Sequence, residues 1–159
     1  MDFSNFFSYP TGDGSRSAED LVFLNELAES DWDRLLALTQ VTRFRAGEIV
    51  LRQGDPQRTL YIVGAGKLEV VVPRGKDQQR VATIDEGSVF GEQAFFDGRP
   101  RSATVRAVTD CELMALHHEA FETLAANEPR LAQLVLMDLG RILSLRLRDA
   151  TKVIASWVG

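Results

Sequence analysis

Residues 89 to 103 carry the side chains whose types and spacing best support a chemical function. The segment reads Val-Phe-Gly-Glu-Gln-Ala-Phe-Phe-Asp-Gly-Arg-Pro-Arg-Ser-Ala. Gly91 permits a positive φ or a close backbone approach, and residues 92 to 96 can form one helical turn whose free N–H groups point outward. Arg101 offers a planar cation suited to two phosphate oxygens, and Ser102 adds a hydroxyl. Together these groups predict a site for one phosphate.

Glu92 has a different role in this segment, because a carboxylate repels a phosphate. We expect it to face away from the phosphate and to accept hydrogen bonds from a sugar hydroxyl. The combination then predicts a phosphate and a ribose, which is a nucleotide. The alternative is a buried ion pair between Glu92 and Arg101. The neighbouring glycine, alanine, proline and serine favour the ligand site.

The elements that must position this segment are mostly β-strands. Between residues 41 and 117 the apolar residues recur with a period of two, and glycine-containing turns separate short β-branched runs. Because no crossover helices intervene, the pattern predicts an antiparallel sandwich, jelly roll or small barrel. The expected strands are Val41–Phe44, Ile49–Arg52, Leu60–Ala65, Lys67–Val72, Arg80–Ile84, Ala103–Val108 and Cys111–Leu116.

Helices are expected on both sides of the β-region. Residues 18–40 have apolar side chains three or four apart, which predicts two short helices with a break near Ser30, where Ser30 or Asp31 would cap the second helix. Residues 118–159 predict a helix from Glu119 to Ala126 and a longer one to about Trp157, opened by Pro129. The fold class is therefore α+β, with N-terminal helices, a β-roll and a C-terminal helical pair.

Residues 1–17 are predicted to be a flexible N-terminal arm ahead of a single domain over residues 18–159. The arm contains turn-forming residues around Pro10, yet it is rich in aromatic rings. These rings either cover apolar surface of the domain or form a docking segment. The aromatic residues are Phe3, Phe6, Phe7 and Tyr9.

The last helix carries two apolar stripes, whereas packing on one side of a β-roll needs one. The second stripe favours a homodimer through this helix, and a wide single-sided contact is the alternative. The first stripe comprises Leu136, Leu139, Leu143, Leu147, Ala150, Ile154 and Trp157, and the second comprises Leu131, Val135, Ile142 and Leu145.

Composition limits the other classes of function. The 159 residues suit one domain, and a net charge of −5 argues against direct binding of nucleic acid. We expect no membrane span and no signal peptide, and hence a cytoplasmic protein. Cys111 is expected in the core, the adjacent His117 and His118 do not suggest a metal site, and Ser102 lacks a recognisable catalytic base. We therefore expect a protein that is not an enzyme and needs no cofactor.

The pattern Gly91-Glu92-x-Ala94, followed after five intervening residues by Pro100-Arg101-Ser102-Ala103, resembles the phosphate-binding cassette of the cyclic nucleotide-binding domain. This module is shared by bacterial catabolite activator proteins, regulatory subunits of cyclic-nucleotide-dependent kinases and cyclic-nucleotide-gated channels. Residues 44–55 and 60–70 also resemble its first strands and their glycine turns. The resemblance covers about residues 20 to 150 and implies an antiparallel jelly roll, with the cassette at residues 90–103.

The resemblance also implies a role for each cassette residue. Glu92 would accept the ribose 2′-hydroxyl, and Arg101 would neutralise the cyclic phosphate. Arg146 would stack on the purine or donate to its edge, or else it is an exposed or salt-bridged surface arginine. The remaining expected ligand-binding positions are Gly91, Ser102 and the backbone N–H groups of Gln93, Ala94 and Ala103, with Phe90, Val81, Leu68 and Val70 as the apolar wall.

The predicted function is that of a non-catalytic sensor, which binds a 3′,5′-cyclic nucleotide and signals by moving its C-terminal helices to an unidentified protein partner. The ligand is cAMP or cGMP, with cAMP favoured. One alternative is a sensory fragment of a DNA-binding regulator, although the two C-terminal helices use the residues that a helix-turn-helix would need. Another is a small jelly-roll enzyme such as a phosphodiesterase.

Overall fold

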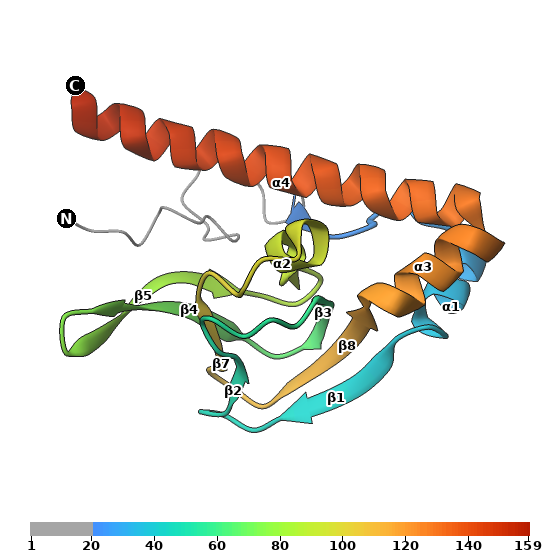
Figure 1. Ribbon diagram of the computed structural model, residues 1–159, viewed down its shortest axis with the longest axis horizontal. Coiled ribbons are helices and arrows are strands. Elements are labelled where there is room, and N and C mark those ends of the chain that lie inside the picture. The colour runs from blue at the N-terminus through green and yellow to red at the C-terminus, as the bar shows by residue number, and fades with distance from the viewer. Residues whose placement is uncertain (1–20) are drawn as a thin grey trace.

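The computed structural model describes residues 21–159, in which eight strands form two antiparallel sheets of four (Figure 1). One sheet has the strand order β1-β8-β3-β6, and the other has the order β2-β7-β4-β5. The strands are β1 (Gln40–Phe44), β2 (Ile49–Leu51), β3 (Thr59–Ala65), β4 (Leu68–Arg74), β5 (Asp77–Ile84), β6 (Val89–Phe90), β7 (Thr104–Ala107) and β8 (Cys111–His117). The predicted antiparallel β-roll with flanking helices is confirmed.

Four helices accompany the sheets: α1 (Glu29–Leu36), α2 (Glu92–Asp97), α3 (His118–Asn127) and α4 (Pro129–Val158). The 30-residue α4 runs along one side of the roll, and the short α2 lies between α4 and the strands (Figure 1). Pro129 occupies the first turn of α4, as the sequence predicts, where its missing N–H has no intrahelical partner to lose. The helical turn predicted at residues 92 to 96 is α2.

Two apolar clusters make up the core. One lies beneath the helices and joins α1, α2, α3 and α4 to β3, through residues such as Leu35, Phe95 and Leu139. The other fills the inside of the roll, where side chains of both sheets meet, among them Val81 and Leu113. Because α2 contributes to the first cluster and follows directly on β6, the cassette lies where the roll and the helices meet.

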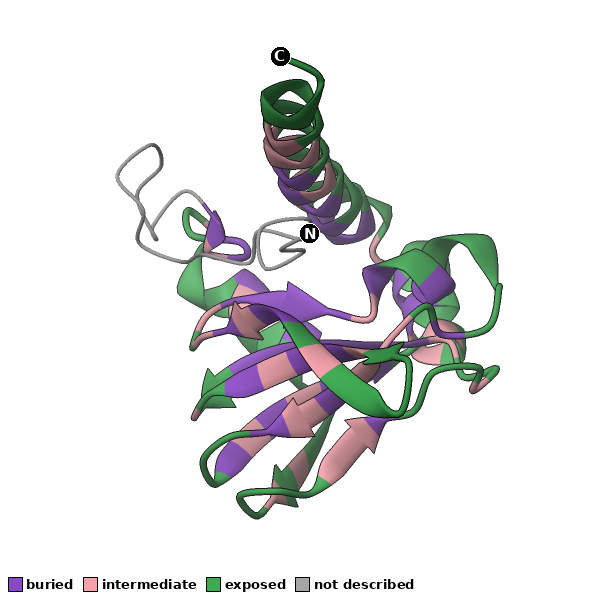
Figure 2. Cartoon of the chain, turned by 90° about the vertical axis from the view of Figure 1, so that its left-hand side faces the viewer, coloured by how far each residue is buried: buried purple, intermediate pink, exposed green. Residues whose placement is uncertain are grey.

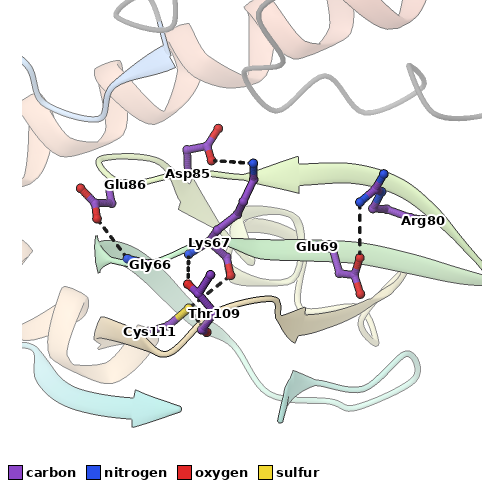
Figure 3. A network of polar contacts seen from close by, with 8 residues as sticks. All are labelled: Gly66, Lys67, Glu69, Arg80, Asp85, Glu86, Thr109 and Cys111. Atoms are coloured by element: carbon purple, nitrogen blue, oxygen red, sulfur yellow. Dashed lines mark hydrogen bonds and ion pairs between the residues drawn. The ribbon is translucent and has the colours of Figure 1, made fainter. Parts of the chain in front are cut away.

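Side-chain and backbone hydrogen bonds hold together the turns at one end of the roll (Figure 3). The backbone N–H of Gly66 donates to Glu86, and that of Lys67 donates to Thr109 Oγ1. Gly66 has φ +95°, and a Cβ there would lie 2.4 Å from the carbonyl oxygen of Asp110. A side chain at this turn would therefore force β3 and β8 apart.

Two expectations about the first described residues are wrong. Residues 21–28 form turns and a short 3₁₀ segment instead of a first helix, because their apolar side chains, such as Phe23, are buried in contact with the roll. The cap of α1 is Ala28, without a side-chain cap, in place of Ser30 or Asp31. Asp31 is buried and accepts two hydrogen bonds of 2.8 Å from Arg130.

The strand predictions agree with the structure except at β6, which was not predicted. Its two residues pair with Tyr61 and Ile62 of β3 and lead directly into the cassette. The arm predicted at residues 1–17 lies outside the described residues.

The apolar stripes of α4 divide differently from the prediction. Leu139 of the first stripe is buried on the same face as Leu131, Val135 and Ile142 of the second. Figure 2 shows this buried face turned toward the roll. Most of the first stripe remains exposed: Leu136, Leu147, Ile154 and Trp157. None of the described helices is long and apolar enough to cross a membrane.

Candidate functional site

A concave pocket opens between the cassette and the inner face of one sheet. Its floor comes from three neighbouring strands, because Val105 of β7 pairs with both Leu51 of β2 and Val70 of β4. The remaining wall is the cassette: Gly91, Glu92, Gln93, Ala94, Arg101, Ser102 and Ala103. The structure therefore gathers an apolar floor and a polar wall around one space.

Gly91 makes the transition from β6 to α2 possible. Its φ of +83° is in the left-handed region, which favours glycine. A Cβ at this position would lie 2.7 Å from the carbonyl oxygen of Thr59 and 2.8 Å from Arg101 Nη1. Glycine is thus needed both for the backbone conformation and for the close approach of two neighbours.

Arg101 is buried, with 5 % of its surface exposed, and is held by backbone carbonyls. Its Nη1 donates to Gly91 O at 2.9 Å, and its Nη2 donates to Thr59 O at 2.7 Å. Within residues 21–159 its buried Nε has no hydrogen-bond partner. Burial lowers the pKa of Arg101, and the negative charges of Glu92 and of nearby ionisable groups oppose this shift. The side chain is a fixed cation in the pocket wall, and each of its terminal nitrogens has a second N–H besides the one donated to a carbonyl.

Ser102 and Gln93 face each other across the cassette. Ser102 Oγ donates to Gln93 Oε1 at 2.9 Å, and both residues line the pocket. Because the hydroxyl can rotate, the Ser102 O–H can donate to another acceptor in place of Gln93.

Glu92 forms a buried ion pair with α4. Its Oε1 lies 2.6 Å from Arg146 Nη1, and the two side chains are 4 % and 7 % exposed. Arg146 Nη2 also donates to Val89 O at 2.7 Å. Arg146 is thus a buried, salt-bridged residue, and its contact with the purine stays a prediction. The described partner of Glu92 is therefore Arg146 and not Arg101.

The expected apolar wall is only partly in contact with the pocket. Val70 lines it, whereas Leu68, Val81 and Phe90 do not and are buried in the apolar cluster inside the roll. Phe90 stacks on Tyr61, with 5.1 Å between ring centroids. Leu51 and Val105 line the pocket and were missed. The alternation of inward side chains along their strands is the signal that could have found them.

Comparison with known proteins identifies the family to which this architecture and site belong. The model of the cyclic nucleotide-binding domain matches residues 41–128. The chain belongs to the cyclic nucleotide-binding domain family. The matched segment contains all eight strands except the first residue of β1, together with the whole cassette.

The relatives of this cyclic nucleotide-binding domain include receptors and channels. It is 34% identical to the cyclic AMP receptor protein of Thermus thermophilus over 78% of this chain and 56% of that protein. It is 34% identical to a cyclic nucleotide-gated potassium channel of Mesorhizobium japonicum over 56% of this chain and 23% of the channel. The chain thus spans about half or less of these relatives. A solved cyclic nucleotide-binding domain from Methylobacillus flagellatus superposes with a TM-score of 0.77, 25% identity and coverage of 87% and 82% of the two chains.

The other reactive side chains of the domain have structural partners. His117 Nδ1 lies 2.9 Å from Thr59 Oγ1, and His118 Nδ1 lies 3.5 Å from Glu122 Oε1. The Cys111 thiol is buried, and burial raises its pKa. Among residues 21–159 no group of three or more histidine, cysteine, aspartate or glutamate side chains could hold a metal ion.

Proposed function

We propose that this domain binds a 3′,5′-cyclic nucleotide monophosphate in the cassette pocket, with cAMP favoured over cGMP. The observation that carries the proposal is Arg101, a buried cation at the wall of an apolar-floored pocket. Such a cation is costly to bury unless an anion or oriented dipoles compensate it. Two carbonyls each accept one N–H of its terminal nitrogens, and a phosphate oxygen is a suitable acceptor for the second N–H of either nitrogen.

The phosphate would be held by Arg101, by the Ser102 hydroxyl and by cassette N–H groups. The supporting geometry is that Ser102, Gln93, Ala94 and Ala103 all line the same pocket as Arg101. To donate to a phosphate, Ser102 must release Gln93 Oε1, which requires only rotation of the hydroxyl. The purine would lie over Leu51, Val70 and Val105.

The ribose 2′-hydroxyl would donate to Glu92. A carboxylate has about four lone-pair sites, and the Arg146 contact at Oε1 uses a fraction of them. A ligand on Glu92 would thus lie one side chain away from α4. We propose that this series of contacts, from the ribose through Glu92 to Arg146, couples ligand binding to the position of α4. A downstream protein would recognise the changed position of α4.

The exposed stripe of α4 supports a homodimer as the unit that receives this signal. Leu147 is 68 % exposed, and Leu136 and Ile154 are exposed on the same helix. Contiguous apolar surface of this kind marks protein interfaces. Sedimentation of the full chain with and without cAMP measures the association.

Parallel calorimetric titrations with cAMP, cGMP and cyclic-di-GMP test the ligand assignment. We expect one cyclic mononucleotide per chain and tighter binding of cAMP. Arg101→Ala should weaken binding, whereas Arg43→Ala, on the exposed edge strand β1, should leave it unchanged. Absence of binding by all three ligands would overturn the proposal, and binding of cyclic-di-GMP alone would replace the ligand class.

We further propose that the domain acts in the cytoplasm and does not convert its ligand. Incubation of cAMP with the protein should leave it intact, and release of the linear monophosphate would contradict this. A second candidate is that the chain is the sensory part of a DNA-binding regulator, which its likeness to the N-terminal domain of a transcriptional regulator from Streptomyces coelicolor favours. The coding sequence around this segment, inspected for a helix-turn-helix, decides between them.

A further inference from the structure

Arg58 lies immediately before β3 and reaches the far end of the cassette helix α2. Its Nε donates to Ala94 O at 3.2 Å, and its Nη2 donates to Phe95 O at 2.8 Å and to Phe96 O at 3.2 Å. The last carbonyls of a helix have no intrahelical partners and carry partial negative charge. One guanidinium therefore donates to three carbonyls at the end of α2, of which that of Ala94 also accepts from the N–H of Gly98.

The backbone of the same dipeptide holds two other parts of the site. The carbonyl of Arg58 accepts a hydrogen bond of 3.1 Å from the N–H of His118, the first residue of α3. The carbonyl of Thr59, one residue later, accepts from Arg101 Nη2 at 2.7 Å. The Arg58-Thr59 dipeptide thus connects α2, the cationic side chain and the first C-terminal helix.

The need for such a connection follows from the length of α2. A helix of six residues is unstable by itself, because nucleation costs more than one turn returns. Its position must come from contacts with the rest of the domain. Arg58 provides charge-assisted hydrogen bonds at one end of α2, while at the other end the carbonyl of Gly91 accepts a hydrogen bond from Arg101 Nη1.

We infer that Arg58 is a positioning residue for phosphate binding. It does not line the pocket, and it acts by holding α2 so that the N–H groups and side chains of the cassette face the phosphate in the same geometry as Arg101. The inference rests on the proposed function and names a residue that sets affinity without touching the ligand.

Three variants of the full chain test this role: Arg58→Met, Arg58→Lys and Arg43→Met. Methionine keeps an unbranched apolar stem and removes every donor, whereas lysine restores a charge without the planar fork. Arg43→Met is the matched control, since Arg43 lies on β1, at the edge of its sheet opposite β6, and hydrogen-bonds Glu112 of β8. Calorimetry with cAMP gives the affinity, and thermal unfolding without ligand gives the stability.

We expect Arg58→Met to weaken cAMP binding by about tenfold, equivalent to ~1.4 kcal/mol and to about one hydrogen bond to a charged group. Arg58→Lys should recover part of this loss, and Arg43→Met should bind like wild type. The loss in Arg58→Met should not add to that of Ser102→Ala, because both changes disturb the same phosphate shell. A purely structural arginine would lower the melting temperature and leave the affinity of the folded protein unchanged.

The outcomes separate the inference from the proposed function. If wild type binds no cyclic nucleotide, the proposed function fails, and the positioning role of Arg58 fails with it. If wild type binds and Arg58→Met binds within twofold, the positioning role alone is overturned. Should Arg58→Met not fold, Arg58→Lys decides: binding at least threefold weaker at an unchanged melting temperature supports the role, and wild-type affinity overturns it.

Discussion

Removing one partner of the ion pair between Glu92 and Arg146 should destabilise the fold by much more than the net attraction between the two side chains. Both side chains are almost fully buried, and their atoms lie 2.6 Å apart. Arg146→Met leaves a buried carboxylate without its described cation. Breaking a buried pair in this way costs about 3–5 kcal/mol, because the remaining charge stays out of water.

The size of the coupling can be worked out from the other two members of a double-mutant cycle. Glu92→Gln leaves Arg146 its hydrogen bond to Val89 O, so we expect a loss of about 2–3 kcal/mol. In the double variant no unpaired carboxylate remains. The double variant should therefore lose about as much unfolding free energy as the more destabilising of the two single variants. The coupling free energy is then about 2 kcal/mol.

Urea unfolding of wild type, the two single variants and the double variant, all without nucleotide, measures this cycle. The slope of the unfolding free energy against urea concentration must be the same in all four proteins. The exposed pair of Arg43 and Glu112 is a matched comparison, because its side chains are largely in solvent and Arg43→Met should cost at most about 1 kcal/mol. If the two single losses add to within about 0.5 kcal/mol in the double variant, α4 is not coupled to the cassette through this pair.

The cassette, α4 and Tyr61 each allow further tests. Arg101→Ala should weaken cAMP binding by roughly 2–4 kcal/mol, about 30- to 700-fold, in calorimetry; a change within threefold in a folded protein would exclude its phosphate role. Glu92→Gln should weaken binding by roughly 1–2 kcal/mol, and 2′-deoxy-cAMP should lose little more in this variant, whereas full additivity would show that Glu92 does not touch the hydroxyl. Leu147→Glu should weaken self-association in sedimentation and leave nucleotide affinity unchanged. In wild type, saturating cAMP should alter dimer affinity or hydrogen exchange in α4 by roughly 1–3 kcal/mol. A wild-type protein that is monomeric with and without cAMP, and whose hydrogen exchange in α4 does not change, would refute both predictions. Burial raises the pKa of Tyr61 above 10.0, and the charge of Arg101 opposes this shift. The contribution of Tyr61 to stability should be full below pH 10 and be lost above it, because the phenol ionises first in the unfolded state. The stability of Tyr61→Phe should therefore fall less steeply than that of wild type in unfolding measurements from pH 9 to 11.

The sequence predicts the β-roll and the cassette well, because both depend on local signals. Alternating apolar residues and glycine turns mark each strand longer than two residues. Gly91, Glu92, Arg101 and Ser102 carry their chemistry in one short segment. β6 was missed because two residues are too few to show a period, and their pairing with β3 is a long-range contact.

The partner of Arg146 could not be read from the sequence for a different reason. Glu92 and Arg146 are 54 residues apart, and the direction in which α4 crosses the roll decides whether the arginine meets the carboxylate or the pocket. Arg58 was missed because acceptors at the end of a short helix are backbone carbonyls, which every residue has. Residues 21–28 have helical spacing, yet contacts with the roll determine their conformation.

The hairpin between β4 and β5 suits an optical reporter of α4. Gly75 at its tip has φ +61°, and nothing lies within 4 Å of the place where its Cβ would be. Exposed tips of this kind tolerate insertion and labelling. A cysteine beside Gly75 would react with a maleimide dye in preference to Cys111, whose thiol is buried and has a raised pKa. A second dye near Val158, at the end of α4 on the same side of Figure 1, would convert displacement of the helix into a change in energy transfer.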